Sequence, residues 1–176
     1  MEALLLQHGQ DNLCWWAANT GRLDVLQWAR AHNCTWDEMV YTSAANNNHV
    51  HILEWAYANN CPVGHLKKKY PHYAAAANGY LDVLKWFYEH EFTLPKYMFA
   101  EAARNGHLHI LQWGHAEKIN CLWNVNVCSN AAAGGHLTIL KWLHEIGCPW
   151  DAQTCNEAAK NGHFDILKWA NENGCP

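Results

Sequence analysis

The sequence predicts an all-α solenoid of stacked helix-turn-helix repeats. A stretch that runs from Ala102 to Trp113 occurs six times, each copy with two alanines, a short polar link and a closing Trp. The copies begin at positions 17, 44, 75, 102, 131 and 158, so the successive steps are 27, 31, 27, 29 and 27. A period of this size is typical of repeats that stack and bury their apolar faces against one another.

Each repeat is expected to contain two short helices. In the last repeat, Asp151 is a candidate N-cap, residues 152–160 form the first helix, and Asn161-Gly162 ends it. Residues 163–173 form the second helix, which is apolar over a wide arc. The sequence therefore predicts one domain over residues 1–176, with a partial repeat at 1–10 and six repeats whose second-helix tryptophans are Trp28, Trp55, Trp86, Trp113, Trp142 and Trp169.

Composition disfavours several classes of function. Half of the 176 residues are apolar, 16% are charged and the net charge is -4, which argues against disorder and against a generic nucleic-acid partner. No apolar run reaches the roughly 18 residues that span a bilayer, and residues 1–6 are too short and lack the basic region of a signal peptide. The eight cysteines follow the repeat, so an intracellular location, in the cytoplasm, is expected.

The repeated positions resemble those of ankyrin repeats. Ala158-Ala159, Gly162-His163, Ile166-Leu167 and Asn173-Gly174-Cys175 fall on the landmarks of that family. The unit is about 27 residues long instead of about 33, and the missing residues fall in the connector, so the β-hairpin fingers are expected to be shortened or absent. This short form resembles repeats of giant DNA viruses of amoebae and of some amoebae, oomycetes and algae, which implies host-cell cytoplasm if the chain is viral.

Cysteine and histidine could indicate a metal site, but their spacing favours structural roles. Zinc sites bring cysteines two to four residues apart, whereas Cys121 and Cys128 are seven apart, as are Cys148 and Cys155. The histidines that follow the glycine are expected to bond neighbouring backbone groups. His49-Val50-His51 and His107-Leu108-His109 are not expected to chelate metal, because residues two apart in a helix point apart. No cofactor is expected.

The remaining candidates also have a structural interpretation. The six second-helix tryptophans could stack on bases or sugars, but their fixed place on the most apolar helix face favours the core. Lys67-Lys68-Lys69 is the one basic run, and a solvated surface is favoured over contact with an acidic partner. No phosphate-binding loop, nucleophile elbow or carboxylate pair appears, so no enzymatic activity is expected.

One side of the first helix varies between repeats and is mostly polar. We call its candidate residues the display face. Stacked first helices form a concave surface, so the favoured hypothesis is a non-enzymatic module that binds a protein partner there, with Trp16 as an exposed aromatic anchor. The alternative is a structural spacer that associates end to end, because neither end has a polar closing helix. No nucleic acid, membrane or small-molecule substrate is expected. The display face comprises Trp16, Asn46, Tyr97, Glu101, Arg104, Asn130, Gln153, Glu157 and Lys160.

Overall fold

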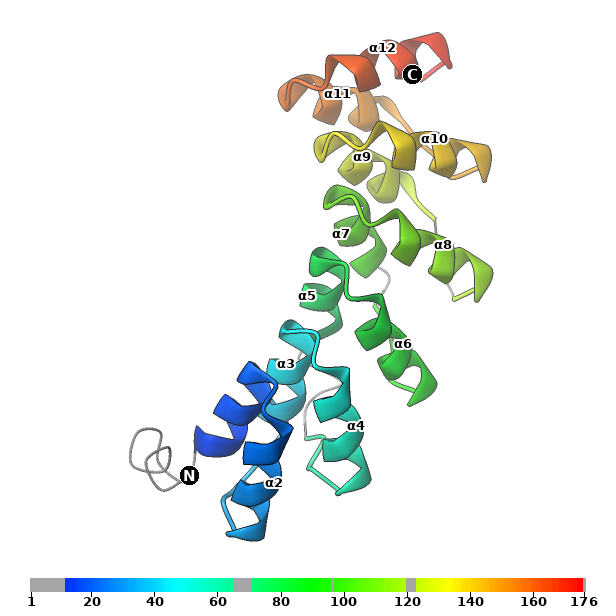
Figure 1. Cartoon of the computed structure of the whole chain (residues 1–176). Coiled ribbons are helices and arrows are strands. Elements are labelled where there is room, and N and C mark those ends of the chain that lie inside the picture. Colours follow the sequence, from blue (N-terminus) through cyan, green and yellow to red (C-terminus); the bar gives the residue numbers. More distant parts are fainter. Residues whose placement is uncertain (1–11, 65–70, 96, 120–122, 176) are drawn as a thin grey trace. The chain divides into compact units, whose positions relative to one another are not determined.

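The computed structural model describes residues 12–64, 71–95, 97–119 and 123–175. Within these ranges the regular elements are helices that follow one another in pairs, and no strand occurs, as expected for shortened fingers (Figure 1). Residues 12–20 pair with α2 (Leu23–Ala31). The other pairs are α3 (Met39–Asn46) with α4 (Val50–Ala58), α5 (Pro71–Asn78) with α6 (Leu81–Glu89), α7 (Met98–Arg104) with α8 (Leu108–Ala116), α9 (Val125–Ala133) with α10 (Leu137–Glu145), and α11 (Ala152–Lys160) with α12 (Phe164–Glu172).

The contacts divide the chain into two compact units. The N-terminal unit comprises Met1–Ala75 with Asp82–Thr93, and the C-terminal unit comprises Ala76–Leu81 with Leu94–Pro176. In the N-terminal unit α3 packs against α4. In the C-terminal unit α7 packs against α9 and α9 against α11, so first helices form a row, and each second helix packs against its own first helix. The predicted partial repeat at 1–10, the Lys67–Lys69 run and Cys121 lie outside the described residues.

The first helices end as the sequence predicts. Gly106 has a φ of +85°, and Asn48, which stands at the equivalent position in an earlier repeat, has a φ of +60°. Glycine adopts this left-handed conformation without strain, and asparagine tolerates it. The asparagine before this position also satisfies an unpaired carbonyl at the helix end, since Asn105 Nδ2 donates to Glu101 O at 2.9 Å. The start of a first helix also agrees with the sequence. At the N-terminus of α11, Asp151 accepts a hydrogen bond from Gln153 N at 3.0 Å, which confirms Asp151 as the N-cap.

The paired alanines allow the first helices to approach closely. In the α7 and α9 repeats, Ala102, Ala103, Ala131 and Ala132 are all fully buried. Alanine adds little bulk between the axes, which is why the position hardly varies while its neighbours do. Behind these helices, a leucine two positions before the second-helix Trp completes the core in five repeats: Leu26, Leu53, Leu84, Leu111 and Leu140 are fully buried.

The second-helix tryptophans are less buried than the sequence suggests. Trp86 is 1% exposed, whereas the other five are half-buried. A half-buried ring lies at the edge of the core, where in three repeats a second Trp from the preceding turn contacts it. The centroid distances are 5.6 Å for Trp36 and Trp55, 5.9 Å for Trp123 and Trp142, and 5.5 Å for Trp150 and Trp169. The prediction that these tryptophans belong to the interior is therefore confirmed for Trp86 and is too strong for the rest.

Candidate functional site

The display face in the N-terminal unit differs from expectation at its aromatic residue. Asn46 is exposed, but Trp16 is half-buried, while its neighbour Trp15 is 40% exposed. The residue just before the alanine pair is covered in the next repeat as well, where Ser43 at the equivalent position is only 4% exposed. Trp15 also lines a cavity of about 120 Å³ together with Cys14, Thr35, Trp36, Asp37 and Val40.

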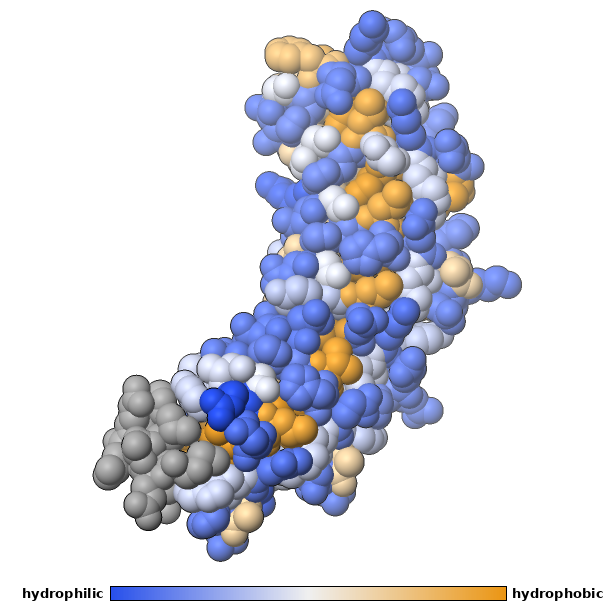
Figure 2. All heavy atoms as spheres, viewed as in Figure 1, coloured by the Kyte–Doolittle hydropathy of each residue, from blue (hydrophilic) through white to orange (hydrophobic). Residues whose placement is uncertain are grey.

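In the C-terminal unit the other seven display residues lie on the row of α7, α9 and α11 or immediately before it. On α7 and α11 the middle display residue is half-buried and the outer two are exposed. The pattern gives a mixed surface with both charges, one phenol and several amides. Hydrophilic side chains predominate on the face drawn in Figure 2, with hydrophobic groups between them. Tyr97, Arg104, Gln153 and Lys160 are exposed, and Glu101, Asn130 and Glu157 are half-buried.

Two of these half-buried groups are held by neighbours on the same helix. Glu157 Oε1 pairs with Lys160 Nζ at 2.9 Å, and Asn130 Nδ2 donates to Asn126 O at 2.8 Å. Surface pairs of this kind contribute only about 0–1 kcal/mol. They restrict the side chains before a partner arrives, which lowers the ordering cost of binding.

The histidine of the Gly-His junction joins one repeat to the preceding one. Its ring donates to the backbone carbonyl at the end of the preceding first helix, a group that the helix itself leaves unpaired. His49 makes this bond to Asn19, and burial lowers the pKa of His49. The predicted backbone role of these histidines is confirmed. The equivalent Nε2-to-oxygen distances are 2.8 Å for His107 to Ala77, 3.0 Å for His136 to Arg104 and 3.2 Å for His163 to Ala133.

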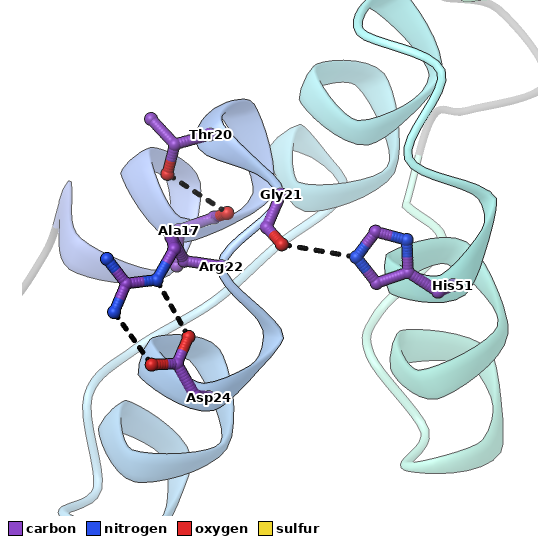
Figure 3. A network of polar contacts seen from close by, with 6 residues as sticks. All are labelled: Ala17, Thr20, Gly21, Arg22, Asp24 and His51. Atoms are coloured by element: carbon purple, nitrogen blue, oxygen red, sulfur yellow. Dashed lines mark hydrogen bonds and ion pairs between the residues drawn. The ribbon is translucent and has the colours of Figure 1, made fainter.

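Two repeats add a second histidine to this contact. His51 Nε2 lies 3.1 Å from Gly21 O (Figure 3). In the later repeat, His109 Nε2 lies 3.0 Å from Gly79 O. The His49 and His51 ring centroids are 5.8 Å apart, so the rings do not point apart as those of two helical residues would. His49 is the N-cap of α4, with a ψ of 66°, and a non-helical residue does not follow the helical angle. Both rings bond backbone oxygens instead of facing a shared metal.

Cysteines that are distant in the sequence lie close together in space, a contact that the spacing of seven residues between successive cysteines does not predict. Cys128 in α9 and Cys148 in the turn after α10 place their Sγ atoms 3.3 Å apart. The turn cysteines also donate to the carbonyl of the residue that precedes or caps the first helix of the same repeat, as in Cys61 Sγ to Asp37 O at 3.3 Å. Among the described cysteines five are buried, as predicted, but Cys155 and Cys175 of the last repeat are half-buried. Within the described ranges, no three His, Cys, Asp or Glu side chains gather to hold a metal ion.

The α11–α12 repeat exposes a surface that the other repeats bury. Ala159 is exposed although Ala132 and Ala103 are fully buried, and Phe164 is 75% exposed. A side chain added at Gly162 would meet nothing within 4 Å, whereas at Gly135 it would meet the ring of His163 at 2.6 Å. Among the described helices, none has the length and apolar character needed to cross a membrane.

No protein-family model and no curated protein sequence matches the chain. Its structure is similar to the crystal structure of the human ASB11 ankyrin repeat domain, with a TM-score of 0.73 and 17% sequence identity. The similarity covers 93% of this chain and 84% of that chain. Identity at this level shows the fold alone. The chain has the all-helical fold of an ankyrin repeat solenoid, in agreement with the resemblance of its repeated positions.

Proposed function

We propose that the chain is a non-enzymatic, intracellular module that binds a protein partner through its display face. The ankyrin repeat fold commonly serves as a protein-interaction scaffold. The observation that carries the proposal is a contrast within the first helices. Their alanine positions are nearly constant and, except for Ala159, buried, whereas the display positions differ between repeats and reach the surface. Core packing does not constrain these positions, so they are able to vary to suit a partner.

The chemistry of the display face suits recognition of a folded protein or peptide with polar and aromatic groups. Tyr97 is 44% exposed at the start of α7, and Arg104 is exposed at its end. Tyrosine and arginine are the residue types that most often carry binding energy at interfaces. Glu101 lies between them, so the α7 portion offers an aromatic, an acidic and a basic group on one helix.

Substitution on α7 tests the proposal. A partner isolated by affinity capture with the full chain should bind at least tenfold more weakly to the variant with Tyr97→Ala, Glu101→Ala and Arg104→Ala, because loss of one or two strong contacts costs about 1.4 kcal/mol or more. The matched control is Gln112→Ala, Thr138→Ala and Lys141→Ala, three exposed positions on second helices. Unchanged affinity of the α7 variant, with a normal circular dichroism spectrum, would exclude this face.

End-to-end association is the second candidate function, and the exposed surface of the α11–α12 repeat favours it. Light scattering over a concentration series should show growing mass if this surface binds a second copy. Phe164→Glu should abolish the growth, because it places a charge in the contact. A constant monomer mass at every concentration contradicts this function and leaves the display-face proposal untouched.

A further inference from the structure

The Cys128–Cys148 pair is a chemical feature that partner binding does not explain. The two Sγ atoms are 3.3 Å apart, and the side chains are 1% and 5% exposed. A disulfide bond is about 2.05 Å long, so a small rotation of the side chains brings the sulfurs to bonding distance. Both residues belong to one repeat and are held by different segments, α9 and the turn that follows α10.

The same two positions recur in every repeat, always at the separation of Cys128 from Cys148. In some repeats the first-helix position holds an aromatic ring, so the turn position of those repeats faces no thiol. The hydroxyl of Tyr41, for example, donates a hydrogen bond to Cys61 O at 3.0 Å. The position is therefore a packing contact that accepts either a ring or a small thiol. Cysteine occupies both positions at Cys14 and Cys34, at Cys128 and Cys148, and at Cys155 and Cys175.

We propose that Cys128 and Cys148 are a site of oxidative modification, at which a hydroperoxide converts the two thiols to a disulfide within one repeat. The Cys148 thiolate attacks a peroxide oxygen, the O–O bond breaks, and Cys148 becomes a sulfenic acid. The Cys128 sulfur then attacks Cys148 Sγ, the S–S bond forms and the S–O bond breaks. With hydrogen peroxide, the thiol protons leave with the two oxygens as two molecules of water, so two electrons pass from the thiols to the peroxide.

The hydrogen bond between the thiols sets the order of these steps. Cys128 donates a hydrogen bond to Cys148 Sγ, which lowers the pKa of Cys148. The same bond, together with burial, raises the pKa of Cys128. Cys148 is also the more exposed of the two side chains. The sulfur that first meets the oxidant is therefore Cys148, and Cys128 resolves the sulfenic acid.

Oxidation would tie α9 to the turn that leads into α11. The bond closes the loop that runs from Cys128 to Cys148, which restricts the unfolded chain. We expect a rise in melting temperature of about 5–10 °C for the oxidised protein. The chain provides an internal control, because Cys61 has the same turn position and Tyr41 replaces the first-helix thiol.

The test uses the full, reduced chain, treated with hydrogen peroxide, alkylated and digested without reductant. Chymotryptic cleavage after Trp123, Trp142 and Trp150 places Cys128 and Cys148 on separate peptides that contain no other cysteine. Mass spectrometry should find these peptides joined and lighter by two hydrogen atoms than their sum. Cys61 should remain alkylated. Equal alkylation of all three cysteines, or accumulation of Cys148 sulfinic acid without the linked peptide, would overturn the proposal.

A variant separates this bond from other effects of peroxide. Cys128→Tyr reproduces the Tyr41 and Cys61 combination, so it is expected to fold, and far-ultraviolet circular dichroism checks that it does. It should lose both the linked peptide and the peroxide-dependent rise in melting temperature. If the rise persists in this variant, another site causes it, and the proposed role of the bond fails.

Discussion

The glycine that ends a first helix is constrained twice, by its own backbone and by the next repeat. Gly106 has a φ of +85°, and a Cβ there would lie 2.8 Å from the ring of His136. That ring in turn donates to Arg104 O. A side chain at Gly106 would therefore strain the backbone and displace a hydrogen bond at the same time.

Alanine substitution at two glycines separates these effects. Gly162 has a φ of +77° but open space around the missing Cβ. Gly162→Ala should lower the free energy of unfolding by about 1 kcal/mol from backbone strain, and Gly106→Ala by about 2–4 kcal/mol because the ring must also move. Urea unfolding of the two variants measures both values. Equal losses would show that the histidine contact contributes little.

A buried histidine makes the N-terminal unit sensitive to acid. His72 is 4% exposed against Phe87, and burial lowers the pKa of His72 to about 4. The unfolded chain has a histidine pKa near 6.5, so folding favours the neutral ring. The associated stability is complete above about pH 6.5 and is lost as the pH falls toward 4, with a total of about 3 kcal/mol.

Replacement of this histidine should flatten the pH dependence. Phenylalanine fits the register, because Phe99 occupies the same position in the next repeat. His72→Phe should lose about 2 kcal/mol less than the wild-type chain between pH 7 and pH 4.5. Urea unfolding at both pH values provides the measurement. Parallel losses in the two proteins would assign the acid sensitivity to other groups.

At the scale of the helix, facing positions of two neighbouring repeats compensate for one another in size. Phe99 of α7 fills the space in which a Cβ at Gly114 of α8 would stand, at 2.3 Å from the ring. The equivalent pair in the next repeat is Cys128 with Leu143, a small first-helix residue opposite a large second-helix one. In these two repeats a large residue on one helix is therefore paired with a small residue on the other.

Gly134 provides a test of this local fit. Four other repeats have asparagine at its position, but a Cβ at Gly134 would lie 2.0 Å from Arg104 O, a backbone atom that cannot rotate away. Gly134→Asn should therefore destabilise the chain by about 1–3 kcal/mol although it matches the other repeats. Gly147→Asn is the matched control, since its φ is +75°, its surroundings are open and Asn33 and Asn60 occupy equivalent positions. Thermal unfolding should leave the control nearly unchanged. Similar melting of both variants would contradict the steric argument.

The sequence predicts those features that depend on local spacing. The helix ends follow from glycine and asparagine, and the alanine face follows from residues three and four apart. The Cys128–Cys148 contact could not be predicted in this way, because residues so far apart in the chain meet only once two helices have folded back on each other. The exposure of Trp15 rather than Trp16 depends on a rotation of about 100° between adjacent helical residues, which the packing of the neighbouring helix determines.

For the whole molecule, the sequence predicts one domain, and we propose that the repeats unfold as one. Each repeat contacts only its neighbours, so cooperativity depends on the strength of every interface. Tryptophan fluorescence and far-ultraviolet circular dichroism should then follow a single urea transition with coincident midpoints. Two separate transitions would instead show that the N-terminal and C-terminal units are independent domains.

The Gly-His junctions mark points at which a whole repeat can be removed from the sequence without a shift in register. Loss of residues 107–135 would join Gly106 to His136 in the chain, and His163 would then face Gly106 in place of Gly135. The new neighbours are the same two residue types that meet at the existing junctions, at which each glycine leaves room for one imidazole. Removal of one unit therefore preserves the glycine–histidine junction, but it also sets Phe99 opposite Leu143 in place of Gly114, so the residue at this position of the second helix limits which units can be lost.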